Sequence, residues 1–116
     1  MKALVSSIIG EEYPIVKGSV VDINNYKDYY KHLECSTFDV VRVEWLGEEI
    51  SIFVDDEGML KSNNFGRMIK GYPQPLFGNM VICGGVDHNG NTMVIPESIG
   101  VLNLNEFIGE IKYQTR

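Results

Sequence analysis

Apolar and polar residues alternate most clearly in two neighbouring segments near the middle of the chain. In residues 41–45 apolar and charged side chains alternate, and residues 50–54 repeat the pattern less cleanly. A period of two is typical of a half-buried strand, and the Gly47 turn between the two runs indicates a β-hairpin. We expect Val41, Val43 and Trp45 to face the core, and Ile50, Ile52 and Val54 lie together on one face of the second strand.

Further strands are predicted on both sides of this hairpin. Residues 3–8 and 79–86 are apolar runs of strand length. Residues 13–21 are also apolar, but a proline and a glycine interrupt them, which is typical of an edge strand. The segment Asp87–Gly90 ends in Asn-Gly, which favours a tight turn, so residues 92–95 are expected to return as a strand.

Two short helices and one helical turn complete the prediction. Asn24-Asn25 offer an N-cap, and the tyrosines and leucine that follow recur at helical spacing until about residue 35. Asn105 is expected to cap a final helix that carries Phe107 and Ile111. Residues 63–69 are expected to form a short helical turn.

Strands outnumber helices in this pattern, and hairpins place consecutive strands antiparallel. We therefore predict the α+β class, with an antiparallel or mixed sheet built from hairpins and two short helices packed on it. No linker or internal repeat divides residues 1–116, so a single domain is expected.

Composition and charge narrow the possible functions. The 116 residues hold 10 Lys and Arg against 16 Asp and Glu, a net charge of −6. A nucleic acid or an anionic membrane is therefore not expected as a partner, because both require a basic surface. The two cysteines and two histidines lack metal-ligand spacing, so neither a metal nor a cofactor is expected. Unpaired cysteines and the lack of a signal-peptide pattern predict a cytoplasmic protein.

The whole excess of negative charge lies in one segment. Residues 39–58 contain seven acids and one arginine, a net charge of −6, so the charges elsewhere cancel. Two interpretations remain open: the carboxylates could keep a solvated strand edge from pairing with other edges, or they could dock onto a basic protein surface. The residues predicted to bind such a partner are Glu44, Glu48, Glu49, Asp55, Asp56 and Glu57.

A loop pocket around the two prolines of the chain's centre is the alternative site. In this pocket Arg67 would anchor an anion through hydrogen bonds, Tyr72 would form a stacking wall, and Asn79 would lie beside them. Scaffold roles are also open for these residues, because an arginine can hydrogen-bond loop carbonyls. No combination of nucleophile and base stands out, so no catalytic residue is assigned and a non-enzymatic protein is expected.

The second half of the chain contains an ordered series of short motifs. Val54–Lys61, Asn64, Arg67 and Gly71–Asn79 resemble a family of small bacterial domains of unknown function that occur on phages, plasmids and conjugative elements. The resemblance implies an α+β domain and a mobile-element setting, and it implies no catalytic residues.

Two functions therefore compete. In the first, a mobile-element accessory protein binds and inhibits a host protein through its acidic hairpin, as inhibitors of restriction or CRISPR nucleases do. In the second, the chain is a small-molecule or nucleotide-binding module with a pocket near Arg67 and Tyr72. A homodimer is compatible with both.

Overall fold

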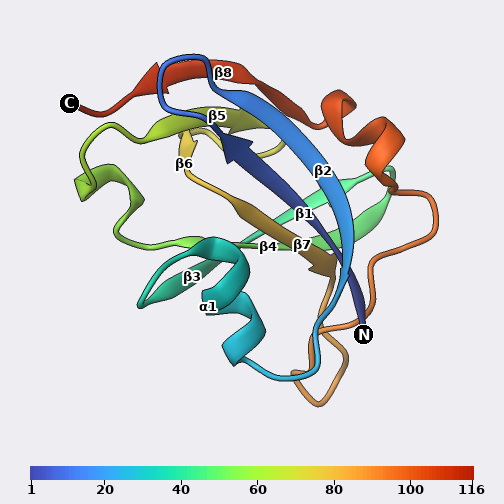
Figure 1. Cartoon of the computed structure of the whole chain (residues 1–116). Coiled ribbons are helices and arrows are strands. Elements are labelled where there is room, and N and C mark those ends of the chain that lie inside the picture. The colour runs from blue at the N-terminus through green and yellow to red at the C-terminus, as the bar shows by residue number, and fades with distance from the viewer.

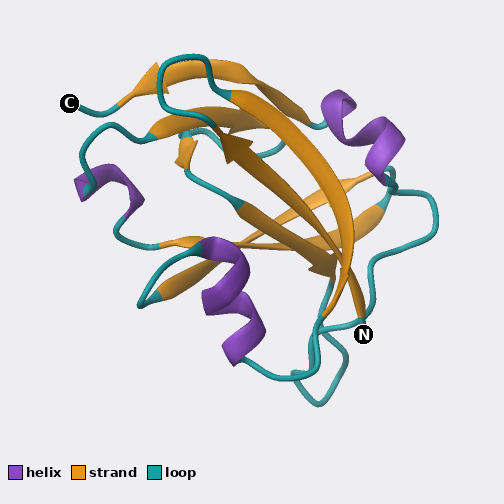
Figure 2. Cartoon of the chain, in the orientation of Figure 1, coloured by secondary structure: helices purple, strands orange, loops and turns teal.

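The computed structural model describes residues 1–116, which form two sheets and three short helices (Figures 1 and 2). The strands are β1 (Lys2–Ile9), β2 (Ile15–Asp22), β3 (Phe38–Trp45), β4 (Glu48–Asp55), β5 (Phe65–Ile69), β6 (Leu76–Phe77), β7 (Met80–Gly84) and β8 (Ile108–Gln114). The helices are α1 (Lys27–Leu33) and the 3-10 helices η1 (Gly58–Leu60) and η2 (Val101–Glu106). Sheets accompanied by short helices confirm the predicted α+β class.

The larger sheet has the strand order β2-β1-β7-β4-β3, and every neighbouring pair is antiparallel. The predicted hairpin forms its β3–β4 edge, where Leu46 and Gly47 have φ angles of 53° and 76°. Two successive positive φ angles give a turn whose twist matches that of the flanking strands. β7 lies between the β1–β2 and β3–β4 hairpins and so joins them into one sheet.

Each face of the larger sheet is covered by a different layer. On one face, Tyr29 and Leu33 of α1 pack with Phe53, Val81 and Cys83. On the other face lie η2 and the smaller antiparallel sheet, of order β6-β5-β8. Figure 1 shows α1 and β8 on opposite sides of β1 and β7. The central strands are therefore buried on both faces, which explains their nearly continuous apolar runs.

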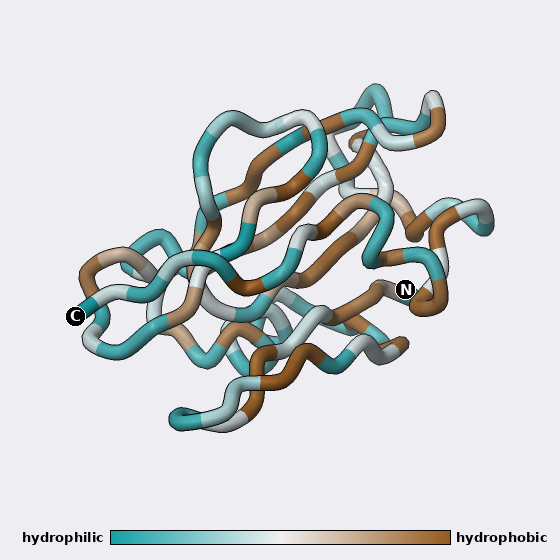
Figure 3. The backbone as a smooth tube through the Cα atoms, turned by 90° about the horizontal axis from the view of Figure 1, so that it is seen from above, coloured by the Kyte–Doolittle hydropathy of each residue, from teal (hydrophilic) through white to brown (hydrophobic).

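Hydrophobicity follows this layering. In Figure 3 many of the hydrophobic stretches, drawn brown, run through the body of the molecule, and teal is frequent at its edges. None of the helices has the length and hydrophobicity to cross a membrane. The three side chains predicted to face the core, Val41, Val43 and Trp45, are buried. Ile50, Ile52 and Val54 of the second strand are buried as well.

Three predicted elements are wrong, and in the first two pairing between distant segments overrides a local pattern. Residues 63–69 were expected to be helical, but β5 begins at Phe65 and pairs with both β6 and β8. The final helix expected from Asn105 is instead β8, which pairs with β5. The return strand expected at 92–95 makes a single bridge, between Val86 and Thr92.

Candidate functional site

The predicted acidic surface is divided between the two ends of β4. Glu44, Glu48 and Glu49 are exposed beside the hairpin turn, and Glu44 and Glu49 lie directly opposite each other in the β3–β4 pair. Asp55 ends the same strand, seven residues beyond Glu48. At ~3.3 Å per residue the two acidic groups are about 23 Å apart, so they form two separate surfaces.

Asp55 is wrongly predicted as a partner-binding residue. It is only 9% exposed, and its Oδ2 lies 2.5 Å from Nζ of Lys61. Its Oδ1 accepts a hydrogen bond from the Glu57 amide at 2.9 Å. The hydrogen bond to Asp55 raises the pKa of Lys61. This carboxylate is therefore neutralised within the molecule.

The two acids that follow Asp55 are also in contact with the rest of the chain. The Thr37 hydroxyl lies 3.2 Å from Oε1 of Glu57 and within hydrogen-bonding distance of Oδ1 of Asp56. The Lys61–Asp55 contact is the only ion pair in the structure. The carboxylates that remain clear of such contacts are those at the other end of β4, although Oε1 of Glu49 accepts a 3.3 Å bond from the Val86 amide.

Arg67, the predicted anion anchor, is completely buried, with an exposed fraction of 0%. Its Nη1 donates to Oγ of Ser6 at 2.6 Å, and its Nη2 donates to the carbonyl oxygens of Ser6 and Gly78, each at 3.3 Å. Its Nε has no acceptor, and no carboxylate pairs with it. Burial lowers the pKa of Arg67 to about 10, so the side chain remains a cation at neutral pH.

An irregularity in β5 places Arg67 between the two sheets. The pairing of β5 with β8 shifts register on both sides of Arg67, and such bulges redirect the side chain of the extra residue. At Gly66, a Cβ atom would lie 2.7 Å from the Phe77 ring, so only glycine lets β5 approach β6 this closely. Arg67 consequently reaches Ser6 on β1, 61 residues earlier in the chain.

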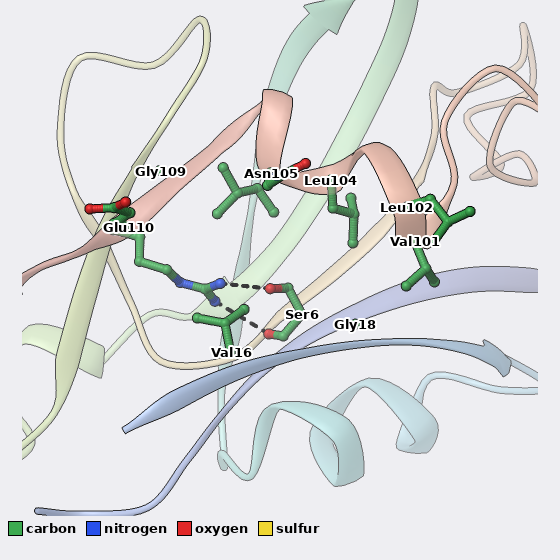
Figure 4. Close-up of a pocket in the computed structure, with 11 residues that line it drawn as sticks. Ser6, Val16, Gly18, Val101, Leu102, Leu104, Asn105, Gly109 and Glu110 are labelled. Atoms are coloured by element: carbon green, nitrogen blue, oxygen red, sulfur yellow. Dashed lines mark hydrogen bonds between the residues drawn. The ribbon is translucent and has the colours of Figure 1, made fainter. Parts of the chain in front are cut away.

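Arg67 and Ser6, which are both buried, are among the residues that line a cleft of about 590 Å³ (Figure 4). Asn105 and Glu110 also line the cleft, and Figure 4 shows the Glu110 carboxylate directed away from Ser6. The cleft lies between β2, η2 and β8. Its apolar walls are formed by Val16, Val101, Leu102, Leu104 and Ile108.

The other two residues of the predicted pocket do not line this cleft. Tyr72 is half-buried and packs against the core between the sheets. Asn79 uses its side chain to hold the backbone, because Oδ1 accepts from the Ile8 amide at 2.9 Å and Nδ2 donates to the His32 carbonyl at 3.0 Å. Of the three residues predicted to share a pocket, Arg67 lines this cleft, whereas Tyr72 and Asn79 lie outside it.

The sequence did not indicate the residues that accompany Arg67. These residues are far from Arg67 along the chain, and only the packing of the two sheets brings them together. They are Ser6, Val16, Gly18 and the residues of η2. A weak signal existed in the apolar residues of β2, since an edge strand with an exposed apolar face is unusual for a surface without a partner.

The remaining reactive side chains do not build a second site. Burial raises the pKa of the Cys83 thiol to about 11, which keeps it protonated within the core. Burial, followed by the nearby Asp55, also raises the pKa of Cys35, so neither cysteine is activated as a nucleophile. No group of three His, Cys, Asp or Glu side chains is arranged to hold a metal ion.

Comparison with known proteins identifies a family without an assigned activity. A family model described as a domain of unknown function (DUF3846) matches residues 11–107. No curated protein and no solved structure matches the chain. Because the model spans most of the sequence, the chain belongs to this family of domains of unknown function.

Proposed function

We propose that this member of a family of unknown function is a binding module that holds a small organic anion in the Arg67 cleft. One observation carries the proposal: a fully buried guanidinium lines the cleft without any carboxylate partner. Buried arginines are rare unless they are paired, because a buried charge without a counter-ion is costly. An anion bound in the cleft would supply the missing counter-ion.

The lowered pKa of Arg67 indicates how much free energy a bound anion could contribute to the stability of the folded chain. A shift from the ordinary value of 12.5 to about 10 corresponds to roughly 3 kcal/mol that disfavours the charged form, at 1.36 kcal/mol per pKa unit. An anion within hydrogen-bonding distance favours the charged form and so offsets this cost. Two of the five N–H groups of Arg67, one of them Nε–H, make no hydrogen bond within the protein.

The cleft contains the groups needed for binding but not those needed for catalysis. Ser6 already accepts a hydrogen bond from Arg67. The one carboxylate that lines the cleft, Glu110, is directed away from Ser6 (Figure 4), so it is not placed to act as a base on that hydroxyl. A nucleophile requires a base within hydrogen-bond reach. We therefore infer that a ligand is held here without being transformed.

Thermal and calorimetric titration with a panel of small carboxylates and phosphates tests the proposal. An anion at 100 times its dissociation constant should stabilise the native state by about 2.7 kcal/mol. Val16→Phe, which narrows the cleft, should abolish this effect. Val20→Phe is the matched control, since Val20 lies on the same face of β2 and outside the cleft. If no anion stabilises the wild type, the proposal is wrong.

A second candidate function rests on the acidic end of the hairpin. Glu48 and Glu49, together with Glu97, line a shallow depression of about 530 Å³, and no base in the chain pairs with them. The Glu44–Glu49 pair also places like charges opposite each other, which costs stability. Because these carboxylates lower the stability of the fold, we infer that they serve to bind a basic partner protein. That the chain is a mobile-element inhibitor of a host nuclease stays a proposal.

Co-purification from host lysate at low and high salt tests this second candidate. The bait is compared with a triple variant that carries Glu44→Lys, Glu48→Lys and Glu49→Lys. The matched control, Glu11→Lys with Glu12→Lys and Asp22→Lys, makes the same charge change at exposed positions elsewhere. A partner that is lost at high salt and lost by the first variant alone supports the proposal. Equal recovery of the same partner by both variants contradicts it.

A further inference from the structure

We infer that the ligand of the Arg67 cleft is a monocarboxylate with an apolar body, such as an acyl or branched alkyl acid, rather than a phosphate or a nucleotide. This inference rests on the proposed function, because it names the chemical class of the anion held there. Three independent properties of the cleft lead to it: the number of charges, the number of free donors and the character of the walls.

The charges of the cleft match a single negative charge. Arg67 is the only cationic residue among those that line it, and Glu110 is a lining residue of opposite sign. A carboxylate neutralises Arg67 one for one in formal charge. A phosphate monoester carries between one and two negative charges at neutral pH, so it leaves an excess that faces Glu110 in a chain of net charge −6.

The donors of the cleft are also few, and Arg67 is the one basic side chain among them. Its Nη1 and Nη2 donate three hydrogen bonds to Ser6 and Gly78, which leaves two of its five N–H groups, one of them Nε–H, and the side-chain amide of Asn105. Phosphate sites in proteins combine several backbone amides, often at a helix N-terminus or in a glycine-rich loop, with a basic side chain. A carboxylate, which has two oxygens, needs fewer donors.

The walls of the cleft favour an apolar body behind the acid group. Leu104 and Ile108 are buried, whereas Leu102 is 98% exposed and Val16 is 49% exposed, so apolar side chains extend from the interior to the mouth. The volume of about 590 Å³ lies in the range of small-molecule sites, ~300–1,000 Å³. A nucleotide would place several hydroxyls and phosphate oxygens against these walls, where Asn105 and Glu110 are the few polar side chains besides Arg67 and Ser6.

The entrance implied by these exposures is the gap between Val16 and η2. Arg67 itself has no solvent-accessible surface, so a carboxylate contacts it only when the apolar walls move apart. An acid group on an apolar chain can do so because the chain replaces the contacts that the walls lose. Inorganic anions, which lack such a chain, should bind weakly.

The inference is tested by isothermal titration with three matched series: straight-chain carboxylates of four to ten carbons, the corresponding alcohols and the corresponding alkyl phosphates. Carboxylate affinity should rise about fourfold per methylene group, the factor for ~0.8 kcal/mol per buried CH₂, until the chain fills the cleft. At equal chain length, the alcohol should bind at least tenfold more weakly. The alkyl phosphate should bind more weakly at pH 8 than at pH 5.5, where it carries a single charge.

Variants separate the acid group from the apolar chain. Arg67→Met should remove the preference for carboxylate over alcohol and keep the dependence on chain length. Should this variant fold poorly, Glu110→Gln serves in its place, because Glu110 is exposed. Glu110→Gln should tighten carboxylates about two- to fourfold, as expected for an exposed charge, and should tighten alkyl phosphates by more. Val16→Phe should weaken every member of the series, and Val20→Phe none.

The outcomes distinguish this inference from the proposed function. Tighter binding of alkyl phosphates than of carboxylates at pH 8 overturns the inference and leaves the anion-binding function standing. Binding of short, chain-independent anions such as inorganic phosphate likewise overturns the inference alone. Equal binding of carboxylates and alcohols, or no binding of any anion, overturns both.

Discussion

The molecule contains two buried charged side chains that differ in whether they have a counter-ion. Asp55 is 9% exposed and has Lys61 at 2.5 Å. Arg67 is 0% exposed and has only neutral oxygens as hydrogen-bond partners. The first charge joins the end of β4 to the segment after η1, and the second lies between the two sheets. One charge is complete within the chain, whereas the other lacks a counter-ion.

This difference indicates which of the two charged side chains stabilises the fold. A buried pair is strongly coupled, so removal of one partner destabilises the protein. A buried cation that has no partner contributes little to stability beyond its hydrogen bonds, and desolvation opposes it. Asp55 therefore acts as a fixed part of the fold, while Arg67 is the group whose environment improves when an anion arrives.

The largest predicted effect concerns the paired charge. Lys61→Met leaves the Asp55 carboxylate buried with no cation, and we expect the free energy of unfolding to fall by about 2 kcal/mol. This lies below the ~3–5 kcal/mol of a fully buried pair, because the Lys61 side chain is 45% exposed and water screens the contact. Urea denaturation measures the change.

The matched control for this prediction is Lys70→Met. Lys70 is exposed and makes no ion pair, so its replacement should change the free energy of unfolding by less than about 0.5 kcal/mol. If Lys61→Met and Lys70→Met lowered the free energy of unfolding equally, the Lys61–Asp55 ion pair would not stabilise the fold. The contrast between Asp55 and Arg67 would then be wrong.

The next effect concerns pH and the unpaired charge. The folded-state pKa of Arg67 is about 10, below the ordinary value of 12.5, so the unfolded chain binds this proton more tightly. The penalty is complete below about pH 10 and decreases as the pH rises above it. Relative to Arg67→Met, the wild type should therefore gain about 1 kcal/mol between pH 9 and pH 11.

Denaturation of both proteins at the two pH values measures this gain. All other titrating groups are common to the two proteins and cancel in the difference. A constant difference, or a loss of wild-type stability relative to the variant, would show that Arg67 has an ordinary pKa and does not lack a partner.

A smaller effect is expected from the other half of the ion pair. Asp55→Asn retains an oxygen that can accept the hydrogen bond from the Glu57 amide, and the half-exposed Lys61 can turn toward water. We expect a loss of about 1 kcal/mol, the typical value of one hydrogen bond and about half the loss for Lys61→Met. Urea denaturation of the two variants tests the asymmetry, and a larger loss for Asp55→Asn contradicts it.

Local patterns were sufficient to predict the hairpin and α1. The alternation in residues 41–45 identified the buried face of β3, because the period of two is a property of the strand itself. The helical spacing of residues 26–33 located α1 but only part of its buried face, because Tyr29 and Leu33 are buried whereas Tyr26 is exposed. By contrast, Phe107 and Ile111 are four residues apart in a segment that includes β8, and pairing with β5 overrode the helical spacing.

The candidate site was predictable in one residue only. Arg67 stood out as the cation of an ordered motif, but its neighbours come from β1, β2, η2 and β8, and no local rule relates these segments. The prediction of the acidic surface was incomplete for the opposite reason. Charge counting located the carboxylates along the chain, yet it could not distinguish Asp55, which a lysine six residues later neutralises, from Glu44, which no base neutralises.

Glu44 is a third case to set beside Asp55 and Arg67. Like Arg67 it has no counter-ion, but unlike Arg67 it is exposed to solvent. It lies opposite Glu49 in the β3–β4 ladder, and like charges in that position repel each other. Glu44→Gln should therefore raise the free energy of unfolding by about 0.5 kcal/mol. The gain should disappear in 1 M salt, where the screening length is ~3 Å, whereas Glu12→Gln, at an exposed position outside the hairpin, should have no effect at any salt concentration. Destabilisation by Glu44→Gln would mean that this carboxylate makes a favourable contact of its own, and an unpaired charge would then no longer indicate a binding surface in this protein.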